Sequence, residues 1–291
     1  MLKIFCQIDD FVKTLRQNAE LKILLKGPKK QRLRSSQLTL SERMTILVSF
    51  HQSRFRDFKS FYMLHVSTNL KKEFPQLISY SRFVRLMPDT LIALMLFLDS
   101  KLGKSTGISF IDSTPVKICH NKRINRNKTF EGLAKRGKST MGWFYGFKLH
   151  FTINDRGEMM SYCLTPANTD DRTPLNILTK KLHGKLFGDK GYISKEKSKI
   201  LLEKGVQLIT SIKSNMKNKL MPYMDKILLR KRFLIETIND LLKNQLQIEH
   251  TRHRSSANFL VNLVSGLVAY TFNPKKPALN VNYKGQKMIA A

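Results

Sequence analysis

Apolar residues in the first hundred positions recur at spacings of three and four, which is the periodicity of an amphipathic helix. The pattern predicts helices over residues 9–18, 20–25 and 80–98. Another helix is expected to begin after Thr39. Thr39 and Glu42 have the spacing of a capping box, in which each side chain accepts the backbone N–H of the other residue. The N-terminal third of the chain is therefore predicted to be helical.

Residues 50–61 combine aromatic and basic side chains in one short segment. The aromatic residues are Phe50, Phe55, Phe58 and Phe61, and the basic residues between them are Arg54, Arg56 and Lys59. One interpretation is a buried aromatic face with a solvated basic back. The other is a helix-turn-helix-like unit that docks on DNA. The two are compatible, because a helix that reads DNA also needs a buried back.

Beyond residue 106 the pattern changes to strands. A short apolar run, Ile108–Ile111, ends at Asp112. Residues 145–153 then alternate with a period of two, and a turn joins them to a third strand over 159–165. Helices are predicted over 171–182, 194–204, 226–246 and 258–270, and strands over 184–187 and 206–212. Three strands followed by alternating helices and strands is the order of the ribonuclease-H-like α/β fold, a mixed sheet with helices on both faces.

This pattern divides the chain into three parts. Residues 1–105 are predicted to form an all-helical DNA-binding region, and residues 106–272 a ribonuclease-H-like catalytic domain. Residues 273–291 are predicted to form a basic flexible tail, because they are rich in Lys and Pro.

Charge adds a partner to this picture. The chain has 52 Lys and Arg residues against 21 Asp and Glu residues, a formal net charge of +31. Such an excess suits a polyanion, because each cation that neutralises a phosphate releases a counterion. Nucleic acid is favoured over a membrane surface, since no basic amphipathic anchor stands at a chain end and the apolar run 91–98 is too short to span a bilayer. Three cysteines without a CxxC pair fit the reducing cytoplasm.

Three acids stand out in this basic chain. Asp112 follows the first predicted strand, Asp189 follows the fourth in a Gly-Asp-Lys-Gly-Tyr turn, and Glu236 lies on the helix after the fifth. Singly, each is most simply a turn, cap or solvated helix residue. Because the first and fourth strands of this fold are neighbours, the three carboxylates can converge. Two Mg²⁺ ions (or Mn²⁺) acting on a phosphodiester need such shared oxygen ligands.

Other residues have two interpretations each. The loop between the first two long strands is dense in base and either is solvated or contacts DNA. Trp143 is expected to be a core anchor rather than a platform for bases. Asp170 and Asp171 either cap a helix or belong to the site, and the cluster 250–254 is more consistent with DNA contact than with zinc. The residues assigned to DNA contact are Lys122, Arg123, Arg136, Lys148, His150 and Lys190.

Longer motifs point to a family. They are FIDSTPVKICHNKRI, FEGLAKRGKSTMGWFYGFKLH, TPANTDDRTPL, KLFGDKGYIS, LLRKRFLIETINDLLK and QIEHTRHRSSANFLVNLVSGLVAY, spread over residues 108–270. Through them the chain resembles DDE-type insertion-sequence transposases, and within these the insertion-sequence 982 family. The resemblance implies that Asp112, Asp189 and Glu236 are catalytic metal ligands.

Some transposases carry a Tyr-x2-Arg-x3-Glu-x6-Lys signature around the third acid. Arg232, Glu236 and Lys243 match it here, while Leu229 stands in place of the Tyr. The resemblance therefore assigns Arg232 and Lys243 to DNA contact. An Arg one helical turn before Glu236 can reach a phosphate bidentately.

The resemblance implies a transposase that cleaves element ends and joins the freed 3′-OH to target DNA. It also implies terminal inverted repeats as partners, a homodimer on DNA, no membrane association, and a location with the nucleoid in the bacterial cytoplasm. A metal-dependent nuclease of the same fold and a catalytically inactive DNA-binding derivative are the alternatives. A protein that coats nucleic acid through charge alone leaves the three acids unexplained.

Overall fold

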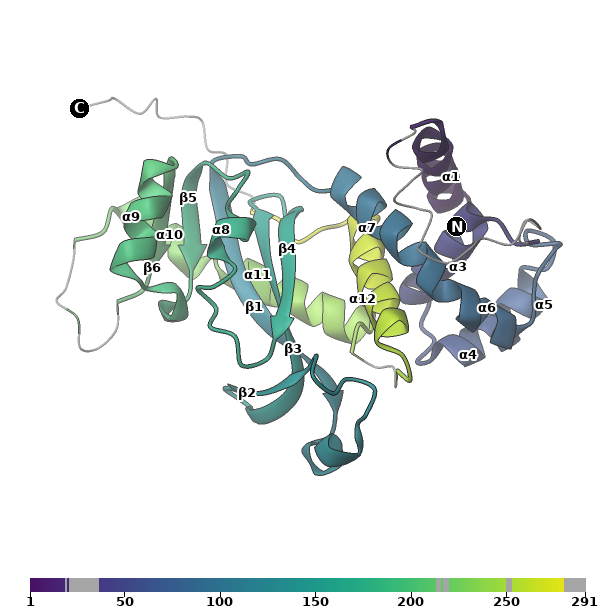
Figure 1. Ribbon diagram of the computed structural model, residues 1–291. Coiled ribbons are helices and arrows are strands. Elements are labelled where there is room, and N and C mark those ends of the chain that lie inside the picture. Colours follow the sequence, from purple (N-terminus) through teal and green to yellow (C-terminus); the bar gives the residue numbers. More distant parts are fainter. Residues whose placement is uncertain (19, 21–36, 213–215, 217–219, 250–252, 280–291) are drawn as a thin grey trace.

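The computed structural model describes residues 1–18, 20, 37–212, 216, 220–249 and 253–279. Helices from the first hundred residues gather at one end, and a six-stranded sheet lies at the other (Figure 1). The last helix, α12 (Ser256–Thr271), lies between the two and packs against α7 and α3. N-terminal helices and C-terminal segments therefore share one hydrophobic core, which runs from Ile4 to Tyr270.

The N-terminal region is helical, as the apolar periodicity predicted. Its helices are α1 (Leu2–Gln17), α3 (Leu40–Gln52), α4 (Phe58–Phe61), α5 (Ser67–Asn69), α6 (Tyr80–Leu86) and α7 (Leu91–Ser100). The capping box is present. Thr39 Oγ1 accepts the Glu42 N–H at 3.2 Å, and the Glu42 carboxylate accepts the Thr39 N–H at 2.7 Å. The helix predicted over 20–25 falls almost wholly outside the described residues.

The aromatic residues of the segment 50–61 pack together. Phe50 and Phe61 are buried, and Phe58 meets Phe50 edge-on at a centroid distance of 5.4 Å. Phe55 meets Phe61 in the same way at 5.7 Å. Offset contacts of this kind stabilise beyond the apolar area they bury. The buried-face interpretation is confirmed for these rings, and DNA docking by this segment stays a prediction.

The sheet is mixed and has the strand order β2-β3-β1-β5-β6, with β4 also paired to β3. Its strands are β1 (Ile108–Cys119), β2 (Lys135–Ser139), β3 (Gly142–Asn154), β4 (Met159–Pro166), β5 (Gly184–Gly188) and β6 (Val206–Thr210). β1 pairs antiparallel with β3 and parallel with β5. The expectation that the strands before Asp112 and Asp189 are neighbours is confirmed.

The first strand is longer than the sequence predicted, so Asp112 lies within β1 rather than at its end. Pairing with β3 continues from Ser109 to Cys119. The apolar run ends near the point where pairing of β1 with β5 ends, at the Phe110–Phe187 pair. Beyond that pair one side of β1 is an open edge. Pro115, which has no N–H to donate, is tolerated there.

Two predicted helices are also shorter or broken. The helix expected over 171–182 is a single turn, α8 (Leu175–Leu178), because a residue that precedes proline, here Thr173, is disfavoured in the helical region. The helix expected over 226–246 consists of α10 (Tyr223–Arg230), α11 (Phe233–Asp240) and a π-helical turn over Leu241–Gln245. The interruption at Lys231–Arg232 directly precedes the helix that carries Glu236.

Helices cover both faces of the sheet. Ile111 packs in a small cluster with Leu175 of α8 and Leu201 of α9 (Lys195–Glu203). Its neighbour Phe110 belongs to the large core shared with Ile235 of α11. Successive side chains of a strand point to opposite faces. Asp112 therefore faces α11, whereas Ser113 faces α8 and α9.

The C-terminal residues up to Leu279 lie against the turn between β3 and β4, where the Leu279 N–H donates to the Asp155 carbonyl at 2.7 Å. Most of the predicted tail falls outside the described residues. Among the described residues, none of the helices combines the length and apolar character that crossing a membrane requires.

Candidate active site

Asp112 and Asp189 stand level with one another at the end of the parallel strand pair. Phe110 of β1 pairs with Phe187 of β5, and each acid lies two residues farther along its strand direction. Asp189 caps a short 3₁₀ turn over Lys190–Tyr192, and its carboxylate accepts the Lys190 N–H at 2.7 Å. Parallel neighbours thus bring two acids, 77 positions apart in sequence, to one edge of the sheet.

Glu236 reaches the same edge from α11, with Arg232 between it and Asp112. The Arg232 guanidinium lies 2.9 Å from Glu236 Oε1 and 3.8 Å from Asp112 Oδ1. Its position one helical turn before Glu236 places both side chains on one face. In this state Arg232 is the counter-charge that two of the three predicted ligands share.

The surroundings of the Asp112 carboxyl disfavour its charged form. Its pKa is raised from 3.8 to about 6, chiefly by burial and in smaller part by the nearby Glu236 and Asp189 charges. The Ser113 N–H and the Arg232 charge act in the opposite direction but do not offset the burial. Asp189 and Glu236 are therefore both near enough to Asp112 to repel its charge.

Asn239 is a member of this site that the sequence did not suggest. Its Nδ2 donates to Asp112 Oδ2 at 2.9 Å. Its Oδ1 is buried and has no hydrogen-bond partner among the described residues. The available signal was its spacing, since Asn239 lies three residues after Glu236 on the same helical face. A buried acceptor without a partner is costly, and here it lies beside a buried carboxylate.

The oxygen atoms of these side chains are of the type that binds a hard divalent cation, although the side chains do not converge on one point. Among the described residues, no three His, Cys, Asp or Glu side chains are placed to hold a metal ion. Instead, Arg232 occupies the space between Asp112 and Glu236. Carboxylate oxygens and the unpartnered Asn239 Oδ1 are the ligand type that Mg²⁺ and Mn²⁺ prefer. The residues present fit the ion that the DDE pattern implies.

Four of the predicted DNA contacts are exposed in the structure. They are Lys122, Arg123, Arg136 and Lys190. Lys122 and Arg123 lie in a 3₁₀ segment over Asn121–Arg126. Arg136 lies on β2, a strand that the sequence pattern did not reveal, because residues 135–139 are mostly basic and were interpreted as loop. Exposure leaves these four side chains accessible to a polyanion.

Lys148 and His150 share one face of β3, as expected, but it is the face opposite Asp112. Lys148 Nζ lies 3.0 Å from both Asp171 Oδ1 and the Thr169 carbonyl. His150 is fully buried, with Nε2 2.8 Å from Thr165 Oγ1. The expectation that His150 contacts DNA does not fit this burial, because no atom of its side chain reaches the surface.

Lys243 has a carboxylate partner inside the protein. Its Nζ lies 3.4 Å from Glu249, and the other Glu249 oxygen accepts the Lys117 N–H at 2.8 Å. The Lys243 side chain is 22% exposed. This pair ties the segment after α11 to β1, which is a structural role beside the predicted DNA contact.

The rival acid pair, Asp170 and Asp171, does not cap a helix, because α8 begins only at Leu175. Asp170 accepts the backbone and Nε hydrogens of Arg172, both at 2.8 Å. Asp171 Oδ1 accepts from Ser113 Oγ at 3.1 Å and from Lys148. Both acids are thus paired within the protein.

Two comparisons with known proteins found matches. The transposase DDE domain family matches residues 102–256, a segment that contains all three acids. A cryo-EM structure of the piggyBac transposase synaptic complex with hairpin DNA is similar in fold, with a TM-score of 0.51 and 11% identity, covering 93% of this chain and 71% of that one. No curated protein sequence matches the chain. Because the family match spans more than half of its residues, the chain belongs to the transposase DDE domain family.

Proposed function

We propose that the protein is an insertion-sequence transposase that cleaves element ends and joins the 3′-OH to target DNA. Its catalytic domain is ribonuclease-H-like, and its motifs are those of the insertion-sequence 982 family. One observation carries the proposal. Asp112, Asp189 and Glu236 come from three separate segments, yet the Phe110–Phe187 strand pair sets the two Asp residues level and Arg232 contacts both Asp112 and Glu236.

Asp112, Asp189 and Glu236 would hold two Mg²⁺ or Mn²⁺ ions. When bound, these ions activate the attacking hydroxyl and stabilise the leaving oxygen in an in-line displacement. Asn239 orients the Asp112 carboxylate through its 2.9 Å hydrogen bond. Arg232 bridges Asp112 and Glu236, and with both carboxylates engaged by metal its guanidinium would be free to bind a DNA phosphate.

The proposed partners are the terminal inverted repeats and the target DNA, bound by a homodimer. The formal net charge of +31 supports a polyanionic partner. The helical region over residues 1–105, with Lys122, Arg123, Lys190 and the other basic residues assigned above, is proposed to bind this DNA. Arg232 and Lys243 are proposed to contact the cut end.

The test is cleavage of a duplex that carries the element end, in Mg²⁺. Asp189→Ala is expected to lower the rate on the order of a thousandfold or more, because several kcal/mol of charge stabilisation are removed. Since Asp189 is exposed and outside the core, binding of the same duplex should change little. Glu203→Gln removes an exposed carboxylate at the end of α9 and serves as the matched control. Cleavage by Asp189→Ala at the wild-type rate contradicts the site.

A second assay separates transposase from nuclease. Element ends with a pre-cut 3′-OH are offered together with supercoiled target DNA, and joined products are counted. A transposase joins them, whereas a nuclease of the same fold yields hydrolysis alone. A chain that binds the duplex but neither cuts nor joins it is the inactive derivative.

A further inference from the structure

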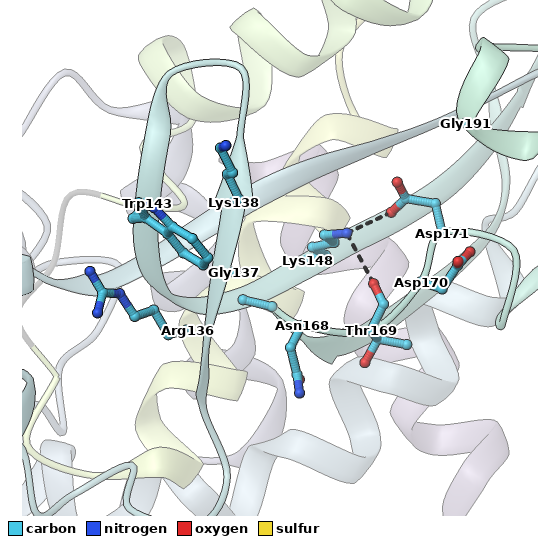
Figure 2. Close-up of a pocket in the computed structure, with 11 residues that line it drawn as sticks. Arg136, Gly137, Lys138, Trp143, Lys148, Asn168, Thr169, Asp170, Asp171 and Gly191 are labelled. Atoms are coloured by element: carbon cyan, nitrogen blue, oxygen red, sulfur yellow. Dashed lines mark hydrogen bonds and ion pairs between the residues drawn. The ribbon is translucent and has the colours of Figure 1, made fainter.

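A hollow of about 480 Å³ lies beside the Asp189 turn, between the β2–β3 hairpin and the segment that follows β4 (Figure 2). Its lining includes Arg136, Lys138, Trp143, Lys148, Asp171 and Gly191. We call it the hairpin pocket. Gly191 lies two residues after Asp189, so the pocket adjoins the candidate active site. Its volume is in the range that holds a small organic ligand.

Trp143, the single tryptophan of the chain, forms one wall of the hairpin pocket. The sequence predicted a core anchor, but the side chain is 54% exposed. An indole that stays half exposed loses much of the burial that usually places tryptophan inside a protein. The exposed surface of the ring is therefore available to a ligand.

Two cations flank this ring. Arg136 Cζ lies 5.1 Å and Lys138 Nζ 5.9 Å from the ring centroid, and Lys138 is the cross-strand partner of Trp143. Figure 2 shows both side chains beside the indole, near the turn of the hairpin. Neither forms an ion pair with a carboxylate in the described part of the chain. Their charge is therefore available to an anion.

The acids of the hairpin pocket are compensated. Asp171 is paired with Lys148, and Asp170 with Arg172. The uncompensated charge of the pocket thus lies at the aromatic ring and is positive. An aromatic platform beside free cations is the combination that binds single-stranded nucleic acid, with bases on the ring and phosphates on the cations.

The wall that carries Trp143 is held firmly. Gly137 lies against the Ala167 carbonyl so closely that a Cβ at Gly137 would come within 2.3 Å of that oxygen. Only glycine allows the hairpin to pack here. On the other side, Lys148 Nζ binds the Thr169 carbonyl and fixes the segment after β4. The backbone on both sides of the pocket is therefore fixed, which lowers the entropic cost of binding.

We propose that the hairpin pocket binds one unpaired nucleotide of the DNA, with its base against Trp143 and its flanking phosphates on Arg136 and Lys138. A paired base is excluded, because its faces are covered by its neighbours in the stack. This inference rests on the proposed function for its setting, since the bound strand continues past Gly191 to the edge where Asp189 stands. The pocket holds the strand that the site cuts or joins.

Trp143 provides its own reporter, because no other tryptophan contributes fluorescence. The full chain is titrated, without metal, with a single-stranded oligothymidylate of about ten nucleotides, a typical site size. The matched probe is an abasic strand of equal length, which keeps the phosphates and lacks the bases. Stacking predicts strong quenching by the oligothymidylate and little by the abasic strand. Equal quenching by both strands means that the pocket binds phosphate only and overturns the proposal.

The variant series uses labelled strands and fluorescence anisotropy. Trp143→Ala is expected to weaken binding of the oligothymidylate roughly 5- to 150-fold, as for the loss of one stacked base. Trp143→Phe should recover part of the affinity, and duplex binding should change little. Met141→Ala, in the same hairpin and 89% exposed, is the control. An unchanged affinity of Trp143→Ala for the oligothymidylate contradicts the proposal.

The two proposals fail in different ways. The titration requires neither metal nor cleavage, so a chain that cuts nothing can still bind the unpaired base. Conversely, the wild type could cut element ends while the Trp143→Ala variant binds single strands with normal affinity. That result would support the active site and refute the proposal for the hairpin pocket.

Discussion

Two clusters of charged residues lie on opposite faces of β1, one step apart along the strand. On the Asp112 face, burial and neighbouring acids raise the pKa of a carboxyl, and Asn239 leaves a buried acceptor unpartnered. On the Ser113 face, Asp171 accepts from both Ser113 and Lys148. In this satisfied cluster the carboxylate charge is paired, which stabilises the fold, although the buried His150 Nδ1 on the same face has no hydrogen-bond partner among the described residues. In the unsatisfied cluster, Arg232 offsets only part of the charge of three carboxylates, and a bound cation would offset the rest.

The largest expected effect is a loss of folding stability at low pH, caused by His150 on the Ser113 face. Burial lowers its pKa from 6.5 to about 4, while Asp171 and Lys148 act on it in opposite directions. Between pH 6.5 and pH 4, His150 is therefore protonated in the unfolded chain and largely neutral in the folded chain. The free energy of unfolding falls as the pH drops through this range. The loss reaches about 3 kcal/mol by pH 4.

His150→Gln removes this titration. Its free energy of unfolding in urea should fall less steeply than that of the wild type over the same pH range. Wild-type and variant curves that stay parallel from pH 7 to pH 4 contradict the assignment. His150→Gln also loses a contact with Thr165, so the slope with pH is compared and not the value at pH 7.

Breaking the satisfied cluster gives the next largest effect. Lys148→Met keeps the length of the side chain and leaves Asp171 without its cation, although Ser113 still donates to it. Since both groups are largely buried, we expect a loss of about 2 kcal/mol in the free energy of unfolding at pH 7. Lys180→Met, an exposed lysine on the segment after α8, is the control and should change it by less than about 0.5 kcal/mol.

Neutralising the unsatisfied cluster should act in the opposite direction. The folded-state pKa of Asp112 is raised, so the charged carboxylate costs stability above pH 6 and costs none below about pH 4. Asp112→Asn is therefore expected to raise the free energy of unfolding by roughly 1 kcal/mol at pH 7, after the lost Arg232 contact is offset. The gain should vanish as pH falls through 6 to 4. Asp10→Asn, an exposed acid on α1, controls for net charge.

The two substitutions together decide whether the comparison holds. Lys148→Met should destabilise and Asp112→Asn should stabilise, although each removes one charge from the same sheet. If both destabilise at pH 7 by similar amounts, the Asp112 face is an ordinary paired cluster, and the electrostatic argument for a ligand there is lost.

The sequence predicted the elements whose signals are local. The capping box at Thr39, the β3–β4 turn and the Gly205 stop of α9, where φ is +76°, all appear where expected. The neighbouring strands of Asp112 and Asp189 followed from element order. These features depend on spacing and turn chemistry, which a single chain displays.

Features that depend on packing were not predictable in this way. β2 carries three basic residues in five and forms only because β3 supplies its hydrogen bonds. His150 was expected to contact DNA but is buried, and Trp143 was expected in the core but is half exposed. Strand periodicity does not tell which face of a sheet another layer covers. Asn239 became a candidate only when its hydrogen bond to Asp112 was known.

The position of α12 has a consequence for how the chain folds. This helix, made of residues 256–271, fills the space between the N-terminal helices and the sheet, and most of its side chains are buried. Its neighbourhood joins distant parts of the chain, such as His51 Nδ1 and the Leu246 carbonyl, which lie 2.6 Å apart and 195 positions apart in sequence. Loops of that length must close before these contacts form, and such topologies fold slowly. During synthesis the first helices therefore wait for α12, and their shared core is completed only after residue 271 has left the ribosome.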